Sequence, residues 1–143
     1  MSSPLVYVVI LTWNHLEDTL ACLETVRRLT YPRYRLLVVD NASTDGTQAA
    51  IAARFPAVEV IVNAANLGYA AGNNVGLRRA LEASANYVLL LNNDTLVAPD
   101  ILDELVAAVL ADDQVGILSP KIYYADPPDR LWYAGARQQP LTL

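Results

Sequence analysis

The run YVLLLNND, residues 87–94, is the feature that most restricts the fold of this chain. Its apolar part is too short to cross a bilayer, and a short continuous apolar run is typical of a strand buried on both faces of a sheet. Asn92, Asn93 and Asp94 follow at the carboxyl end of that strand. Open α/β sheets bind their ligands at this end. We therefore expect a parallel sheet with a polar site directly after residue 91.

Apolar runs of this kind alternate with helical patterns along the chain. Strands are expected over 5–11, 34–39, 58–62, 87–91 and 115–118, with less regular short ones over 122–124 and 131–134. Helices are expected over 16–29, 47–54 and 99–110, and the segment 63–76 is expected to run into a further helix that ends at about residue 83. The first helix begins with a capping-box pattern of Asn14 and Glu17. This alternation predicts βαβ units with right-handed crossovers. The fold class is therefore α/β, with a Rossmann-like, mostly parallel sheet flanked by helices.

The composition excludes several classes of protein. At 143 residues the chain is about one domain, and 54% apolar with 17% charged residues excludes disorder. The formal net charge is −5, so no broad basic surface for nucleic acid is expected. We expect a single domain over residues 1–143 and no nucleic-acid partner.

The single cysteine, Cys22, cannot form an intramolecular disulfide, which fits a reducing compartment. It falls within a helical apolar pattern, so a buried position is expected. The N-terminus has no basic region, and the run 5–11 is too short for a signal peptide or a membrane span. We expect a cytoplasmic protein without a transmembrane segment, and a peripheral position at the inner membrane face is compatible with this.

Three predicted strands end in polar residues at what should be one edge of the sheet. At this edge an aromatic ring, Trp13, and a carboxylate, Asp40, suit a pyrimidine base, because the ring stacks and the carboxylate accepts the imide N–H. Asp94 is a hard oxygen ligand suited to Mg²⁺ or Mn²⁺ beside a diphosphate. The structural alternative is that Asn93 and Asp94 only form a turn or a helix cap.

The segment 66–76 is rich in glycine and asparagine. Gly68 and Gly72 allow the backbone to approach a ligand, and Asn66, Asn73 and Asn74 supply amides that bond a base or a ribose. The alternative is that the glycines permit close packing of a helix on the sheet and the asparagines cap.

Four motifs, VILTWN (9–14), VVDNASTDGT (38–47), NLGYAAGNNVG (66–76) and LLNND (90–94), together resemble those of the family 2 glycosyltransferases. The chain is most similar to the rhamnosyltransferase-like bacterial branch. The resemblance implies a GT-A fold, a nucleotide-diphospho-sugar donor (UDP- or dTDP-sugar), a divalent cation (Mg²⁺ or Mn²⁺), a glycan or lipid-linked acceptor, and transfer with inversion. It also implies a role in cell-wall polysaccharide biosynthesis.

The resemblance also assigns residues. It places the metal on Asp94. Asn92, two residues earlier in the same motif, occupies a position that is Asp in many relatives. The resemblance also makes Asp45 a residue that organises the loop or the nucleotide pocket. The implied nucleotide-binding residues are Thr12, Trp13, Asn14, Asp40, Asn41, Asp45, Asn66, Gly68, Asn73, Asn92 and Asn93.

The general base of such enzymes comes from a segment well beyond the metal motif, and nothing between Ser119 and Leu143 resembles it. We therefore assign no catalytic base and expect a C-terminally truncated domain whose acceptor-side part is largely missing. The apolar residues Trp132, Tyr133 and Leu141 then predict self-association as a homo-oligomer. The alternative to an enzyme is a catalytically incomplete nucleotide-binding module.

Two other classes of α/β domain fit less well. A nicotinamide-dependent dehydrogenase needs a Gly-X-Gly-X-X-Gly turn after its first strand, and residues 12–15 hold no glycine. A phospho-accepting receiver domain would need an acidic pair at the same place, which is also absent from residues 12–14.

Overall fold

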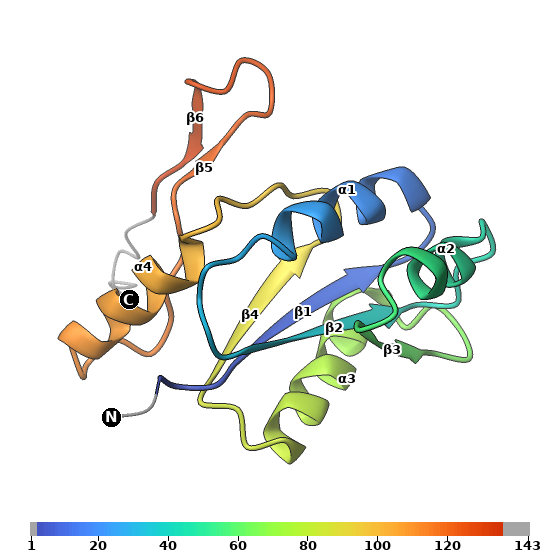
Figure 1. Ribbon diagram of the computed structural model, residues 1–143, viewed down its shortest axis with the longest axis horizontal. Helices are drawn as coiled ribbons and strands as arrows, with labels where there is room; N and C mark the ends of the chain where they lie inside the picture. Colours follow the sequence, from blue (N-terminus) through green and yellow to red (C-terminus); the bar gives the residue numbers. More distant parts are fainter. Residues whose placement is uncertain (1–2, 136–143) are drawn as a thin grey trace, which may run out of the picture. The chain divides into compact units, whose positions relative to one another are not determined.

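The computed structural model describes residues 3–135 (Figure 1). It divides into two compact units, Met1–Asp100 and Ile101–Leu143, and each unit is described by itself. The single domain expected over 1–143 stays a prediction. Among the described residues, no helix has the length and apolar character that a membrane crossing requires.

The first unit is built on a four-stranded sheet with the order β3-β2-β1-β4, and every pairing in it is parallel. The α/β class with a mostly parallel sheet is confirmed. Its elements are β1 (Val6–Thr12), α1 (Leu16–Val26), β2 (Tyr34–Asp40), α2 (Thr47–Arg54), β3 (Glu59–Val62), α3 (Gly68–Glu82) and β4 (Tyr87–Asn92).

The helices cover both faces of the sheet, with α3 on one face and α1 and α2 on the other (Figure 1). Alternate residues of a strand point to opposite faces. Tyr7 and Val9 of β1 therefore join Leu37, Val39 and Ala80 in the core on the α3 side. Val6, Val8 and Ile10 are equally buried. The expectation that the first strand is buried on both faces is confirmed.

The same expectation was wrong for β4. Within the described sheet β4 is an edge strand that pairs with β1 alone, and Leu90 is 41% exposed. A continuous apolar run shows that a strand has two apolar faces, but it does not show how many neighbours cover them.

The second unit consists of α4 (Ile101–Ala111) and an antiparallel pair of short strands, β5 (Ile122–Tyr123) and β6 (Leu131–Tyr133). The strand expected over 115–118 does not form, because this short apolar run finds no partner strand, and Ile117 is 94% exposed. Trp132 is 61% exposed. Leu141 lies outside the described residues, and self-association stays a prediction.

Close contact between α3 and the sheet yields a testable prediction. A Cβ added at Gly76 would lie 2.3 Å from Val9 Cγ1 and 3.2 Å from Val39 Cγ2, both in the core. Gly76→Ala should therefore lower the free energy of unfolding by about 1–3 kcal/mol, because overlap in a packed core outweighs the better helix propensity of alanine. Urea titration measures this difference.

Gly116→Ala is the matched control, since nothing lies within 4 Å of a Cβ added there. It should change the free energy of unfolding by no more than about 0.5 kcal/mol. Equal effects of the two substitutions would contradict the packing described for α3.

Candidate functional site

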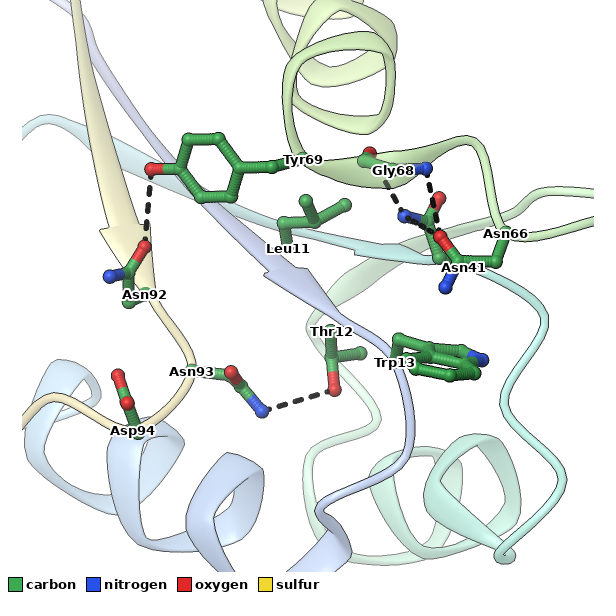
Figure 2. Close-up of a pocket in the computed structure, with 10 residues that line it drawn as sticks. All are labelled: Leu11, Thr12, Trp13, Asn41, Asn66, Gly68, Tyr69, Asn92, Asn93 and Asp94. Carbon is green, nitrogen blue, oxygen red and sulfur yellow. Dashed lines mark hydrogen bonds between the residues drawn. The ribbon is translucent and has the colours of Figure 1, made fainter.

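A pocket of about 310 Å³ lies at the carboxyl edge of the sheet (Figure 2). Pockets for small ligands and cofactors begin at about this size. Ten residues line it: Leu11, Thr12, Trp13, Asn41, Asn66, Gly68, Tyr69, Asn92, Asn93 and Asp94. Eight of them are among the residues predicted for the site, and Leu11 and Tyr69 are not.

The strand register explains why these residues meet. Thr12 pairs with Asp40 on one side, and Leu11 pairs with Asn92 on the other. Because β2, β1 and β4 are parallel neighbours, the residues after each strand emerge at the same level. Trp13 is 53% exposed there, so its ring is available to a ligand.

One wall of the pocket is organised by the buried amide of Asn41. Its Nδ2 donates to Asn66 Oδ1 at 3.1 Å and to the Gly68 carbonyl at 3.2 Å, and its Oδ1 accepts from Asn63 Nδ2 at 2.8 Å. The backbone N–H of Gly68 donates to Asn66 Oδ1 at 2.8 Å. These bonds use most of the hydrogen-bonding capacity of the Asn41 amide, so Asn41 maintains the shape of the wall and has little capacity left to bind a ligand.

Tyr69 joins this wall to β4, since its hydroxyl donates to Asn92 Oδ1 at 3.2 Å (Figure 2). Gly68 has a φ of +76°, a backbone conformation that residues with a side chain rarely adopt. Gly68 begins α3, and the next residue, Tyr69, lines the pocket. The signal that could have found Tyr69 is an exposed aromatic residue directly after a glycine at a helix start.

The end of β4 presents its three polar residues in different ways. Asn93 turns inward, and its Nδ2 donates to Thr12 Oγ1 at 3.3 Å and to Thr19 Oγ1 at 3.0 Å. Asp94 is exposed, and no hydrogen bond or ion pair engages its carboxylate within residues 3–135. Asp94 thus brings to the pocket lining a carboxylate that no described side chain engages.

Asp40 is fully buried and does not line the pocket. Its oxygens accept from the backbone N–H of Ser43 at 3.2 Å, from the Ser43 hydroxyl, and from Gln48 Nε2 at 2.5 Å. In this conformation Asp40 holds the loop between β2 and α2.

Asp45 connects the starts of two helices with one carboxylate. Oδ2 accepts from the N–H of Leu16 at 3.0 Å, and Oδ1 accepts from the N–H of Thr47 at 3.1 Å. The Thr47 hydroxyl, which donates to the same Oδ1, contributes most to lowering the pKa of Asp45, and backbone N–H groups add to it. Asp45 thus organises the loop, one of its two expected roles, and lies outside the pocket lining.

The capping box expected at Asn14 does not form. The N-cap of α1 is His15, and Asn14 Oδ1 accepts instead from the backbone N–H of Thr44 at 2.9 Å. Asn14 and His15 both have positive φ, 60° and 57°, and the Asn14 side chain bonds to the neighbouring loop rather than to α1. Asn14 is not part of the pocket lining.

Asn73 is 5% exposed and donates from Nδ2 to the Tyr69 carbonyl at 3.0 Å within α3, away from the pocket lining. A Cβ at Gly72 would lie 2.6 Å from Leu11 Cδ1. For this second half of the 66–76 segment, the geometry favours packing of helix on sheet.

Comparison with known proteins identifies the family. The model of the glycosyl transferase family 2 matches residues 7–141. The chain belongs to this family. It is 32% identical over 148 residues to the N-acetylglucosaminyl-diphospho-decaprenol L-rhamnosyltransferase of Mycobacterium tuberculosis, covering 98% of this chain and 46% of that protein. The chain thus spans about half the length of the curated relative it matches.

Two of the solved structures that match share the fold of this chain. The mannosyltransferase PcManGT from Pyrobaculum calidifontis, solved with GDP-Man and Mn²⁺, matches with a TM-score of 0.69 and 31% identity over 80% of this chain and 34% of that chain. TarS 1–349 of S. aureus, solved with UDP, gives a TM-score of 0.66 at 18% identity over 82% of this chain and 41% of that chain. The GT-A fold and the similarity to a rhamnosyltransferase, both expected from the sequence, are confirmed.

Cys22 of this family 2 chain contacts the carbonyl of Asn92, one of the residues that line the pocket. It is fully buried in α1, as expected, and burial raises the pKa of its thiol to about 12, with the Asp94 charge as a further, smaller cause. The folded state thus favours the neutral thiol, whereas the unfolded chain loses this proton near its ordinary pKa of 9.0. The stability due to the neutral thiol is complete below pH 9 and is lost as the pH rises towards 12.

The free energy of unfolding should therefore fall by about 1.4 kcal/mol per pH unit above pH 9 through this group alone. Cys22→Ala should remove that part of the slope. Urea titrations of both proteins at pH 8 and pH 10 measure the change in the free energy of unfolding between these pH values. The difference between the two proteins isolates the thiol, because both contain the same ionising tyrosines. Identical slopes would show that the thiol is accessible to ionisation in the folded chain.

Proposed function

We propose that this chain forms the donor-binding domain of an inverting glycosyltransferase that uses a pyrimidine nucleotide-diphospho-sugar, either a UDP-sugar or a dTDP-sugar. The observation that carries the proposal is a single pocket that combines an exposed aromatic ring with a free carboxylate. Trp13 lies on one side of that pocket, and Asn92 and Asp94 lie on the other (Figure 2). A base on Trp13 would direct its diphosphate across the pocket towards Asp94.

Asp40 is the proposed reader of the pyrimidine imide. A carboxylate offers about four lone-pair sites, and contacts from Ser43 and Gln48 reach two on each oxygen of Asp40. An imide N–H would therefore take the Oδ2 site to which Gln48 Nε2 donates. Because Asp40 is buried, base binding requires the Gln48 side chain to move aside.

The residues at the end of β4 fit a divalent cation that the donor completes. Within the described part of the chain, no group of three or more metal-ligating side chains comes together, and Asp94 is the carboxylate that lines the pocket. A hard cation held by one carboxylate keeps most of its waters and takes further oxygens from a diphosphate. When bound, such a cation supplies positive charge to the departing diphosphate, and Asp94 would hold it there.

The acceptor in this proposal is a glycan or a lipid-linked sugar, and the process is cell-wall polysaccharide biosynthesis. The name of the Mycobacterium tuberculosis relative describes a sugar attached through a diphosphate to decaprenol, which supports a lipid-linked acceptor. A cytoplasmic chain at the inner membrane face would meet such a lipid, and the free, buried Cys22 agrees with a reducing compartment. We assign no catalytic base.

Base selectivity is the direct test of the proposal. UDP and dTDP should bind more tightly than ADP and GDP when each is titrated calorimetrically. The guanine nucleotide is the informative competitor, since PcManGT was solved with GDP-Man. Equal affinity for all four nucleotides, or a preference for GDP, would overturn the pyrimidine assignment.

Asp40→Asn should weaken UDP binding by about 1.5–3 kcal/mol, because a charge-assisted hydrogen bond to the imide is lost. The free energy of unfolding of the same variant is the necessary control, since Asp40 also holds Ser43 and Gln48. An affinity loss for ADP equal to that for UDP would assign Asp40 to the loop alone.

Metal dependence provides a separate prediction. Mn²⁺ should raise the affinity for UDP, and Asp94→Ala should abolish this gain while leaving metal-free binding nearly unchanged, because Asp94 contacts the donor only through the cation. Asp112→Ala, at an exposed carboxylate of the second unit, is the control. Tight Mn²⁺ binding to the protein without nucleotide would contradict a site with one protein carboxylate.

Sugar transfer separates the enzyme from a catalytically incomplete nucleotide-binding module. Both bind nucleotide and metal in the same way, and only the enzyme transfers sugar. General-base assistance contributes about 10²–10⁴-fold in rate, so a chain without a base should transfer slowly even with a filled donor pocket.

A further inference from the structure

One face of α1 carries three small side chains in a row, Thr19, Cys22 and Thr25. Residues three apart are neighbours on a helix surface, so the three side chains form a continuous row that runs obliquely to the helix axis. Thr19 and Cys22 are fully buried, and none of the three belongs to the pocket lining. They nevertheless all contact one stretch of chain, residues 92–97, which carries Asp94.

The three contacts lie on both sides of Asp94. Before it, Asn93 Nδ2 donates to Thr19 Oγ1 at 3.0 Å, and the Cys22 thiol donates to the Asn92 carbonyl over an Sγ–O distance of 3.7 Å. After it, the backbone N–H of Val97 donates to Thr25 Oγ1 at 3.2 Å.

The Thr25 hydroxyl is fixed in its direction. A hydroxyl has one proton and two lone pairs. Thr25 donates its proton to the Cys22 carbonyl at 2.8 Å within α1, so its lone pairs are left to accept from the 92–97 segment. The Thr19 hydroxyl lies 3.0 Å from the His15 carbonyl and 2.9 Å from the Thr12 hydroxyl, and it accepts from Asn93 whichever of these two receives its proton.

Before Asp94, the 92–97 segment is also held by the bonds from Tyr69 to Asn92 and from Asn93 to Thr12, and after Asp94 the bond from Val97 to Thr25 of α1 holds it. The segment leaves β4 at Asn92 and does not enter another helix or strand before Ile101. Its own turn is closed by a 3.3 Å bond from the Thr95 N–H to the Asn92 carbonyl. Because the Asp94 side chain has no partner in the described chain, its position depends on the backbone on either side of it.

We propose that Thr19, Cys22 and Thr25 are positioning residues that hold the 92–97 segment against α1 and thereby place the Asp94 carboxylate. The inference rests on the proposed function, because this placement affects donor binding only if Asp94 carries the cation next to the diphosphate. Base recognition at Trp13 is then independent of α1, whereas the contribution of the metal depends on it.

Thr25 offers the cleanest test, because its partner Val97 is not among the residues that line the pocket, whereas the partners of Thr19 and Cys22 are. Thr25→Val keeps the shape of the side chain and removes the acceptor, whereas Thr25→Ser keeps the hydroxyl. Thr30→Val is the control, since its hydroxyl donates to the Pro99 carbonyl at 3.0 Å, outside the 92–97 segment. Each protein is titrated with the tighter-binding of UDP and dTDP, once with Mn²⁺ and once with EDTA.

Thr25→Val should reduce the gain in affinity from Mn²⁺ roughly tenfold, the factor given by loss of one ordinary hydrogen bond, or cancel it where the gain is smaller. Its affinity in EDTA should stay within about twofold of the wild type, and Thr25→Ser and Thr30→Val should keep the full gain from Mn²⁺. A merely structural role would instead lower affinity equally in both conditions, and that result would overturn the proposal.

Amide hydrogen exchange without any ligand separates this inference from the proposed function. In Thr25→Val, exchange at Val97 should accelerate roughly tenfold, while exchange within β4 stays unchanged. Unchanged exchange at Val97 would show that Thr25 does not hold the segment. If the wild type gains nothing from Mn²⁺, the role for Asp94 in metal binding fails, whereas faster exchange at Val97 would still support the contact with α1.

Discussion

The parallel pairing of β1 with a strand on each side is the constraint on which the rest of the first unit depends. It aligns Thr12 with Asp40 and Leu11 with Asn92, although these residues are far apart in the sequence. Because both faces of β1 are buried, a slip of one residue would exchange the side chains that pack against α3 with those on the opposite face. Val9 packs closely against Gly76 of α3, and this specific fit favours the observed register. That register brings the polar strand ends into one pocket.

Most polar groups at this edge bond to one another rather than to solvent. Asn41, Asn93 and Asp45 each connect two or more segments, and no buried side-chain polar atom is without a partner among the described residues. A network with all its members satisfied is rigid, because breaking any one bond leaves a costly unpaired group. The groups left for a ligand are accordingly few, chiefly the Trp13 ring and the Asp94 carboxylate.

The elements of the first unit were predictable because burial imposes a period on the sequence. The helix predicted over 47–54 and the polar ends of three strands appear where the pattern places them. What failed depended on tertiary contacts. The amide of Asn14 bonds to the Thr44 N–H instead of capping α1, and residues 115–118 lack a partner strand.

The candidate site shows the same difference between residues placed by the strands and residues placed by tertiary contacts. Residues that follow a strand directly, such as Trp13 and Asn93, were found because the end of a parallel strand is a defined place in the fold. The burial of Asp40 by Ser43 and Gln48 was not predictable, since it depends on how the following loop closes. Tyr69 was missed because its bond to Asn92 joins α3 to β4, which the sequence separates by a whole helix.

Asn92 takes part in the hydrogen-bond network at the strand ends and also affects the charge of the proposed cation site. A carboxylate at this position would lie two residues from Asp94 at the same strand end, and two like charges there would oppose each other unless a cation were always present. An amide avoids that repulsion and still accepts the Tyr69 hydroxyl. The result is a site with little charge of its own. On the proposed function, the diphosphate of the donor then brings most of the negative charge, so cation and nucleotide should bind together rather than in sequence.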